Sequence, residues 1–324
     1  MQFSISVIIP VYNGERFIKK AILSALQQPE VAEIVVVNDG STDATQAILE
    51  DLQSKNSKLK IFHHKDNLNN GRSASRNLGI EKAAKNFIAF LDADDFYLEN
   101  RFENDRNVFQ KNKKCDGVYN AVGFYFYRAT TTLEMQKNKL YTVSQKIRPD
   151  FLFEALLSGK YGHFHIDGLT VKKSVFKTIG TFNKKLVVAE DTEVFWKMAI
   201  KCQLFTGVID RPVAIRGVHD KNVFDDKELY AKYTIKMFET LVIWCSHNQV
   251  AYSVKDDLLK WIWILIYKQK NKLIADLIYW KHFFFSQPQL LFTILSIKYF
   301  PIVRYRQMLF PFLYKRNIRL KNIL

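Results

Sequence analysis

The stretch Phe87-Ile88-Ala89-Phe90-Leu91-Asp92-Ala93-Asp94-Asp95 joins an apolar run directly to three carboxylates. A short apolar run of this kind predicts a buried strand, so the carboxylates stand at its carboxyl end. One small residue separates Asp92 from Asp94, and both can therefore approach one hard cation, such as Mg²⁺ or Mn²⁺ bound to a diphosphate. The ordinary alternative is an acidic N-terminal cap for a helix that starts near Phe96.

The chain before this stretch alternates between predicted strands and predicted helices. Runs rich in Val and Ile predict the strands, and apolar residues at helical spacing predict the helices. The expected strands are 4–11, 33–38, 59–63 and 87–91, and the expected helices are 15–27, one that ends near 52, and 72–84. This order predicts an α/β fold with a Rossmann-like, doubly wound, mostly parallel sheet, which binds ligands at the carboxyl ends of its strands.

Polar segments follow three of the predicted strands and should meet at one edge of the sheet. They are Pro10-Val11-Tyr12-Asn13, Asn38-Asp39-Gly40-Ser41 and Asp92-Ala93-Asp94. In the second segment, Gly40 permits a tight turn, and Ser41 or Thr42 is expected to cap the next helix. The glycine patterns of dinucleotide-binding folds and of P-loops are missing from the positions that they require, so hydride transfer and P-loop chemistry have no support.

Five motifs in order give the chain a resemblance to the inverting family 2 glycosyltransferases, which have a GT-A fold. They are Val7-Ile8-Ile9-Pro10-Val11-Tyr12-Asn13, Val36-Val37-Asn38-Asp39-Gly40-Ser41-Thr42-Asp43, Gly71-Arg72-Ser73-Ala74-Ser75-Arg76-Asn77, Leu91-Asp92-Ala93-Asp94-Asp95 and Ala189-Glu190-Asp191. The resemblance covers residues 1 to about 220.

The resemblance implies a pocket for a nucleotide sugar, with UDP as the expected nucleotide and GDP or dTDP as alternatives. Its binding residues would be Pro10, Val11, Tyr12, Asp39, Arg72, Asp92, Ala93 and Asp94. A tyrosine at a strand exit can stack on a base, and a carboxylate can accept a hydrogen bond from a base or a ribose hydroxyl. The ordinary alternatives are packing for Tyr12, turn formation for Asp39 and a solvated charge for Arg72.

The same resemblance makes Asp92 and Asp94 the metal-and-diphosphate pair, with Asp94 as the direct ligand of Mn²⁺ or Mg²⁺. Two carboxylates that faced a diphosphate without a cation would repel it. His219 follows a strand that is expected from about Val213, and the resemblance implies that it completes the metal site. The alternative for a lone histidine is a structural role.

The resemblance also implies that Asp191 is the general base of a metal-dependent, inverting sugar transfer. Glu190 and Asp191 open an expected helix at 192–201. Acidic residues at a helix N-terminus are also stabilised by the helix dipole without any catalytic role. Further upstream, 124–127 and 140–143 predict a hairpin beside the acceptor cleft.

Composition describes the setting of this chemistry. The chain has 324 residues, is 48% hydrophobic and carries a net charge of +16. It is long enough for a catalytic domain at 1–222 and a basic, aromatic-rich helical extension at 223–324. Its three cysteines, Cys115, Cys202 and Cys245, lack metal-ligand spacing and favour a reducing compartment. No signal peptide is expected, which favours a cytoplasmic location.

The C-terminal third has the composition of a membrane-surface segment. No acidic residue follows Asp276, whereas the basic residues Lys281, Lys298, Arg304, Arg306, Lys315, Arg316, Arg319 and Lys321 interleave with aromatic residues. The longest uncharged stretch, 283–297, is shorter than a bilayer requires. We therefore expect peripheral association with an anionic membrane at its cytoplasmic face. The alternative is a helical subdomain that packs its aromatic side chains against the catalytic core.

Together these features predict a glycosyltransferase of cell-surface polysaccharide or glycolipid biosynthesis, which acts on a glycan or lipid-linked acceptor. One alternative is a catalytically silent protein that binds nucleotide sugars. A second alternative is a basic nucleic-acid-binding protein, but the sequence has no recognisable nucleic-acid-binding module, so no nucleic-acid partner is expected.

Overall fold

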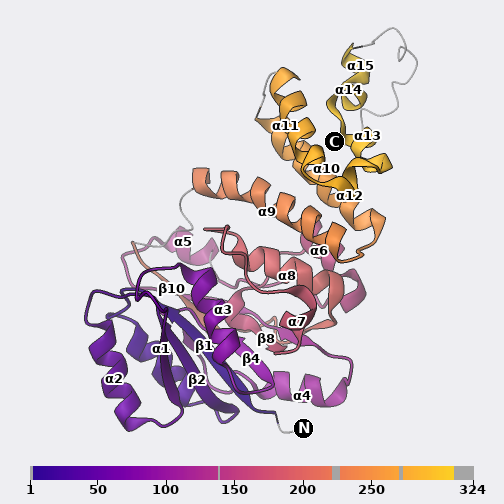
Figure 1. Cartoon of the computed structure of the whole chain (residues 1–324). Helices are drawn as coiled ribbons and strands as arrows, with labels where there is room; N and C mark the ends of the chain where they lie inside the picture. Colours follow the sequence, from indigo (N-terminus) through magenta and orange to yellow (C-terminus); the bar gives the residue numbers. More distant parts are fainter. Residues whose placement is uncertain (1–2, 138, 221–226, 270–272, 310–324) are drawn as a thin grey trace. The chain divides into compact units, whose positions relative to one another are not determined.

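The computed structural model of the chain describes residues 3–137, 139–220, 227–269 and 273–309 (Figure 1). The chain divides into two compact units, Met1–Lys227 and Glu228–Leu324. The expected domain boundary at 222/223 falls in 221–226, outside the described residues.

The first unit is built on a seven-stranded sheet with the order β3-β2-β1-β4-β8-β6-β9. Every described neighbour pair is parallel except the two that involve β8, which runs against both β4 and β6. The strands are β1 (Ile5–Val11), β2 (Val31–Asn38), β3 (Leu59–His63), β4 (Phe87–Phe90), β6 (Gly117–Tyr119), β8 (Leu169–Lys172) and β9 (Leu204–Thr206). The expected mostly parallel, doubly wound α/β sheet is confirmed.

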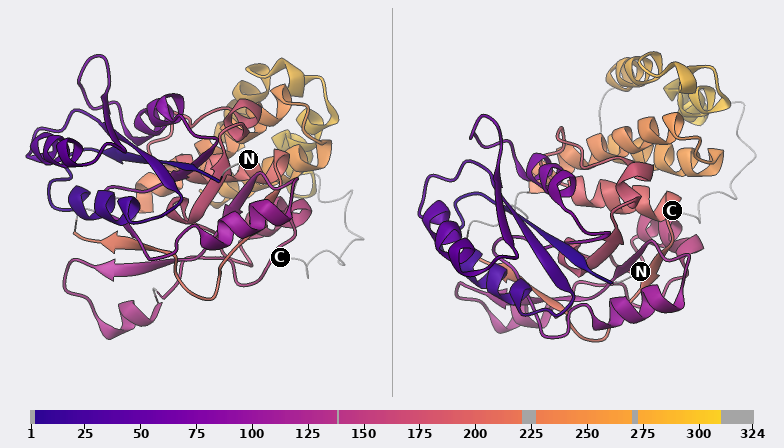
Figure 2. Two further views of the ribbon diagram at one scale, coloured as in Figure 1. Left: turned by 90° about the horizontal axis from the view of Figure 1, so that it is seen from below. Right: turned by 60° about the horizontal axis from the view of Figure 1, so that its bottom comes forward.

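Helices cover both faces of this sheet because its central strands are apolar on both faces. Alternate residues of β1, from Ile5 to Val11, lie in one core cluster with α1 (Ile18–Leu26) and α2 (Thr45–Lys55). On the opposite face, Gly79 of α3 (Arg72–Lys82) packs against Ile8. Figure 2 shows the helices on both sides of the strands. This arrangement brings the carboxyl ends of β1, β2 and β4 to one edge.

A second, three-stranded sheet has the order β5-β10-β7. Its central strand β10 (Ala214–Val218) runs antiparallel to β5 (Phe96–Tyr97) and parallel to β7 (Val122–Phe126). The expected helix near Phe96 is therefore wrong, because the aromatic pair at 96–97 extends to join β10. The next helix, α4, spans Glu103–Lys111.

Two other local expectations are wrong. The segment 124–143 does not form the expected hairpin. β7 pairs with β10, and α5 (Thr132–Lys137) follows it. Among the described residues, the returning chain meets β7 in an antiparallel bridge between Val122 and Tyr141. Ser41 and Thr42 do not cap α2, whose N-cap residue is Ala44. Both instead bond Asn13, whose N–H donates to Ser41 Oγ and whose Oδ1 accepts from the Thr42 N–H, so they tie the exits of β1 and β2 together.

The remaining helices of the first unit are α6 (Leu152–Ser158), α7 (Val175–Ile179) and α8 (Glu190–Lys201), and a short 3₁₀ turn, Ile166–Gly168, precedes β8. The second unit is helical over its described residues. Its helices are α9 (Lys227–His247), α10 (Tyr252–Lys268), α11 (Leu273–Phe285), α12 (Pro288–Leu291), α13 (Ile294–Tyr299), α14 (Pro301–Arg304) and α15 (Arg306–Leu309). Among the described residues, no helix combines the length and the apolar character needed to cross a bilayer.

Candidate active site

The acidic segment after β4 forms a tight turn at the edge of the sheet. The Asp95 N–H donates to the Asp92 carbonyl over 3.1 Å, which closes the turn. A second contact comes from β10, where the Gly217 N–H donates to Asp95 Oδ1 over 2.7 Å. A Cβ at position 217 would lie 2.3 Å from the Asp94 carbonyl oxygen, so only glycine permits this approach of β10 to the turn.

The turn and the end of β10 bring together the two residues expected to bind a metal. Asp94 Oδ2 lies 3.0 Å from His219 Nε2, and both side chains are partly exposed. The His219 ring stacks on Phe17, with ring centroids 5.1 Å apart, which fixes its orientation. The pair is therefore partly accessible at the surface, and Phe17 holds the imidazole in one orientation.

The Asp94 and His219 side chains fit a divalent metal such as Mn²⁺ or Mg²⁺. A carboxylate oxygen is a ligand for either ion, and imidazole suits transition metals. The ligand atoms of Asp94 and His219 are 3.0 Å apart, the separation of a hydrogen bond. Two ligand atoms about 2.1 Å from one ion and at right angles to each other would have about the same separation. A diphosphate or water would have to supply the other ligands.

Asp92 points to a different partner. The Arg76 guanidinium donates to Asp92 Oδ1 over 2.7 Å and to Glu190 Oε1 over 2.8 Å. Arg76 and Glu190 are each 2% exposed, and Arg72 Nε lies 3.2 Å from the same Glu190 oxygen. Burial opposes the charge of Arg76, but Asp92, Glu190 and Asp191 together raise the pKa of its guanidinium. One permanent cation therefore joins the acidic turn to the Glu190-Asp191 motif.

Asp191 lies in the first turn of α8 and is partly buried. The N-cap residue of α8, Ala189, has a left-handed φ of 63°, which turns the chain sharply into the helix. Asp191 Oδ1 accepts from the Thr192 N–H over 2.6 Å. Burial raises the pKa of Glu190, and the charge of Asp191 adds to this effect while Arg72 and Arg76 oppose it. Asp191 is thus a carboxylate at a helix N-terminus, next to the buried arginine.

Asp39 organises the loop that leads to Arg72. Its Oδ1 accepts from the Asn70 N–H over 2.8 Å, and its Oδ2 accepts from the Gly71 N–H over 2.9 Å. The carboxylate is 3% exposed, and its Oδ1 lies 3.3 Å from His64 Nε2. The turn-forming alternative for Asp39 is therefore present in the structure, because its carboxylate holds the loop directly before α3.

The other residues expected in the donor pocket differ in what they present to it. The Tyr12 ring is 50% exposed at the exit of β1, so it is available for stacking. Pro10 and Val11 are buried, and the Val11 side chain belongs to the core. Only backbone groups of these two residues reach the edge, and the Val11 carbonyl already accepts from the Asp39 N–H over 2.8 Å. Ala93 is partly exposed in the acidic turn.

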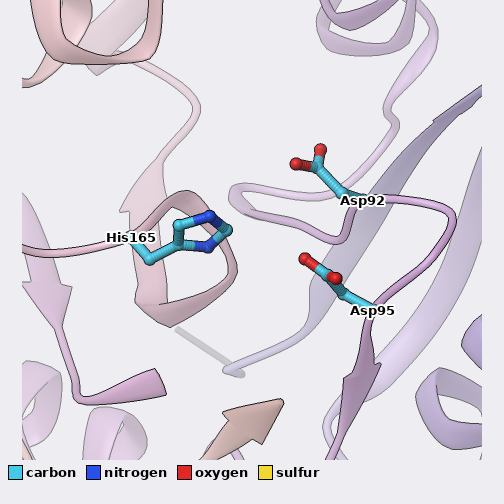
Figure 3. A group of neighbouring side chains, drawn as sticks. All are labelled: Asp92, Asp95 and His165. Atoms are coloured by element: carbon cyan, nitrogen blue, oxygen red, sulfur yellow. The ribbon is translucent and has the colours of Figure 1, made fainter. Parts of the chain in front are cut away.

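A second group of possible ligands lies beneath the turn, where Asp92, Asp95 and His165 offer atoms within 4.8 Å of one another (Figure 3). Asp167 supports this group, because its Oδ1 accepts from the Asp92 N–H and its Oδ2 lies 3.1 Å from His165 Nδ1. Burial and the nearby carboxylates raise the pKa of Asp95 well above its usual value. Burial also opposes ionisation of Asp167, but His165 and a hydrogen bond from Asp95 lower the pKa of Asp167 to about 2. Asp92 and His165 are each already engaged by another side chain, Arg76 and Asp167 respectively, so this group fits a support for the turn better than a metal site.

The supporting residues Arg76, His165, Asp167 and Gly217 were given no role in the sequence interpretation. A signal existed for Arg76, which stands four residues after Arg72 and therefore on the same helix face. Ligand residues are expected after the strands of a parallel sheet. His165 and Asp167 instead precede β8, and they reach the same edge because β8 runs in the opposite direction.

Both the sequence and the fold of the chain match known proteins. The model of the family described as glycosyl transferase family 2 matches residues 6–180, more than half of the chain. The chain belongs to this family. It is 35% identical over 176 residues to an uncharacterized glycosyltransferase of Haemophilus influenzae and 30% identical over 220 residues to one of Rickettsia typhi. These alignments cover 54% and 67% of the chain, and 64% of each relative's length.

Solved structures of glycosyltransferases show the same fold. Residues 1–349 of S. aureus TarS, in complex with UDP-GlcNAc, superpose with a TM-score of 0.63 at 17% identity and cover 94% of this chain and 92% of that one. A mannosyltransferase from Pyrobaculum calidifontis, in complex with GDP-Man and Mn²⁺, gives 0.53 at 15% identity, with 95% and 87% covered. At such identities the likeness establishes the GT-A fold and no more.

Proposed function

We propose that this family 2 glycosyltransferase moves a sugar from a nucleotide diphosphate donor to an acceptor hydroxyl with inversion at the anomeric carbon. One observation carries the proposal: the Arg76 guanidinium contacts Asp92 and Glu190 together. Inverting transfer needs a leaving diphosphate and a general base on opposite sides of one sugar. The arginine brings a candidate for each role, the acidic turn and Asp191, to one site.

The proposed donor is a UDP-sugar bound at the carboxyl ends of β1, β2 and β4. The exposed Tyr12 ring is suited to stack on the base, while Asp39 holds the loop from which Arg72 begins α3. The structural neighbours bind UDP-GlcNAc and GDP-Man, so nucleotide diphosphate sugars are compatible with this fold. We assign the donor pocket and catalysis to residues 1–222.

In this proposal Asp94 and His219 hold Mn²⁺ or Mg²⁺. The bound ion would neutralise charge on the leaving diphosphate. Asp92 stays on Arg76 and keeps the turn in place, while Gly217 and Phe17 fix the two ligands.

Asp191 is the proposed general base, which takes the proton of the acceptor hydroxyl as its oxygen attacks the anomeric carbon. Asp191 lies in the first turn of α8, where a negative charge interacts favourably with the helix dipole. Direct attack inverts the anomeric centre and needs no covalent intermediate. General-base assistance is typically worth about 10² to 10⁴ in rate.

The proposed setting is the cytoplasmic face of a membrane, with a glycan or lipid-linked acceptor of cell-surface polysaccharide or glycolipid biosynthesis. This part of the proposal rests on the excess of basic and aromatic residues at 223–324. The residues Phe310, Phe312, Lys315, Arg316, Arg319 and Lys321 contribute to that excess and lie outside the described residues.

A thermal-shift panel tests the donor and metal together, because a ligand that binds the native state raises the apparent melting temperature. UDP, GDP, dTDP and CDP would each be added with and without Mn²⁺. We expect a Mn²⁺-dependent rise with UDP that is absent in Asp94→Ala. A panel without any rise would contradict the proposed donor class.

Sugar transfer by Asp191→Asn tests the base. We expect about a 10² to 10⁴-fold loss of turnover with the donor-induced thermal shift retained. The matched control is Asp51→Asn on α2, whose carboxylate is 57% exposed and lies outside the five motifs. Normal turnover of Asp191→Asn, or an equal loss of donor binding, removes Asp191 from the role.

A further inference from the structure

We infer that the second unit docks on an anionic lipid surface through the outer face of α11. This inference deepens the peripheral association contained in the proposed function, because it names the docking face and the side chains that would enter the lipid.

The outer face of α11 is an exposed apolar stripe. Ile274, Ile278 and Phe285 are 69%, 64% and 65% exposed, respectively. At about 100° per residue, these three side chains and the exposed Lys281 fall within an arc of about 60°. The stripe therefore runs along one side of the helix for about 16 Å, at 1.5 Å per residue.

The opposite face of α11 already forms the core of its unit. Asp276, Trp280, Phe283 and Phe284 are buried. Trp280 packs against the rings of Trp263 on α10 and Tyr299 on α13, among others. The outer stripe is thus separate from the packed face of the helix, and packing among the described residues of the unit does not account for it.

Exposed apolar side chains continue into the helices that follow. Phe292, directly after α12, is 87% exposed, and Ile294 and Ile297 on α13 are 65% and 64% exposed. α12 is in contact with both α11 and α13. Scattered single apolar residues are normal on protein surfaces, but six of this size and exposure between Ile274 and Ile297 indicate an interaction surface.

The charge of this unit complements anionic lipid. Residues 228–324 contain fifteen Lys and Arg against five Asp and Glu, an excess of ten among the sixteen net positive charges of the chain. Each basic residue near an anionic membrane surface adds about 1 kcal/mol of attraction.

Three of the five carboxylates are also engaged by tyrosine hydroxyls. Tyr279 donates to Glu239, Tyr299 donates to Asp256 Oδ1 over 2.7 Å, and Tyr305 donates to Asp276 Oδ2 over 2.8 Å. Asp276 is 2% exposed, and burial raises the pKa of Glu239. Burial removes Asp276 from the surface and adds to the basic excess there, while the partly exposed Asp256 pairs with Lys298 over 2.6 Å.

The position of Lys281 favours lipid over a second protein surface. Lys281 lies within the arc of Ile274, Ile278 and Phe285, so a dry protein interface would have to bury its ammonium group. A headgroup region instead accepts the apolar side chains while the ammonium extends toward phosphate groups.

The test uses the full chain and co-sedimentation with vesicles of phosphatidylcholine, alone or with about 30% phosphatidylglycerol. We expect binding to the anionic vesicles, weakened by high salt because screening removes the electrostatic part. The triple variant Ile274→Ser/Ile278→Ser/Phe285→Ser should bind at least tenfold more weakly, and Lys281→Glu should weaken binding to the anionic vesicles. The matched control is Leu133→Ser/Met135→Ser on α5, which removes side chains that are 62% and 49% exposed and should leave binding unchanged.

Two results would overturn the inference: no binding of the wild type to anionic vesicles, or equal binding by the triple variant. Sedimentation velocity without lipid tests whether the stripe binds a second copy of the chain instead. Self-association that the triple variant abolishes, together with no vesicle binding, would assign the stripe to that second copy. The UDP-induced thermal shift, measured on the same variants, should stay unchanged. If UDP produced no thermal shift in the wild type, the proposed function would be contradicted. If only vesicle binding were absent, only the docking surface would be contradicted.

Discussion

The carboxylate of Asp94 and the imidazole of His219 lie 3.0 Å apart, although 125 residues separate them in the chain. The first belongs to the turn after β4 and the second follows β10, the central strand of the small sheet. The small sheet therefore has a direct role in the candidate site, because it carries one proposed metal ligand to the other.

Replacement of either proposed ligand should abolish the Mn²⁺-dependent thermal shift with UDP. We expect Asp94→Ala and His219→Ala each to lower Mn²⁺ affinity at least about tenfold, and the double variant to lose little more than either single variant, because the two residues act as a unit. A Mn²⁺ titration followed by melting temperature measures this. Asp220→Ala, which removes a carboxylate that is 86% exposed, is the control, and fully additive losses would argue against a shared ion.

Gly217→Ala should disturb the same site through the backbone. Its Cβ would lie 2.3 Å from the Asp94 carbonyl oxygen, so the turn or the strand must shift, at a cost of about 1–3 kcal/mol in unfolding free energy. We expect reduced Mn²⁺ affinity at a temperature where the variant is folded. Gly79→Ala places its Cβ 2.3 Å from Ile8 Cγ2 in the core, so it should be destabilised but retain Mn²⁺ affinity. If both variants keep the wild-type affinity, the turn does not depend on Gly217.

Arg76→Met should destabilise the first unit strongly. The substitution removes the closest cation of the buried Glu190 and the partner of Asp92, and leaves only Arg72 beside Glu190. Removal of one partner from a buried ion pair typically costs about 3–5 kcal/mol. Arg76→Lys should recover only part of this loss, because an ammonium cannot reproduce the planar fork. Urea unfolding gives the comparison. Arg148→Met, at a side chain that is 74% exposed, should cost less than about 1 kcal/mol. An equally small loss for Arg76→Met would show that the link is not required for folding.

Glu33→Gln should change the stability of the protein with pH. Glu33 is 1% exposed; burial opposes its ionisation, but hydrogen bonds from the Ala84 N–H, Lys60 and Ser6 lower the pKa of its carboxyl. A carboxylate with a lowered folded-state pKa stabilises the protein above the ordinary glutamate pKa, about 4.3, and this stabilisation is lost as the pH falls through the lower folded value. We expect Glu33→Gln to cost about 1–3 kcal/mol at pH 7 and progressively less below pH 4. A difference that is independent of pH would exclude ionisation as its source.

The first half of the first unit could be predicted from sequence because its elements are long and strongly patterned. β1 and β2 are seven and eight residues of nearly continuous apolar character, and the strand exits that follow them define the edge where ligands are expected. The proximity of Asp94 and His219 was also anticipated, although only from the family resemblance. Their metal-binding role stays a prediction.

The remaining parts depend on long-range contacts. β6, β8 and β9 are only three or four residues long, and β5 has two, so their pattern is too short to distinguish strand from loop. The helix expected near Phe96 failed for this reason, because an aromatic pair joins whichever partner strand tertiary packing supplies. The role of Arg76 could not be read either, since it depends on Glu190, which lies 114 residues away along the chain.

The reversed direction of β8 has a consequence for how this chain can change over evolution. Because β8 runs against β4, its entry lies at the acidic turn, and Asp167, fixed by hydrogen bonds from Arg101 to its carbonyl, contacts Asp92 there. The segment between β7 and β8 is also anchored at its start, because β7 pairs with β10. We expect that its largely exposed part, 128–137, tolerates changes of length, whereas α6 does not, because Leu152, Phe153 and Leu156 are buried and α6 packs against α8. Under the proposed function, changes in that exposed part would alter the surroundings of the site and leave the acidic turn and α8 in place.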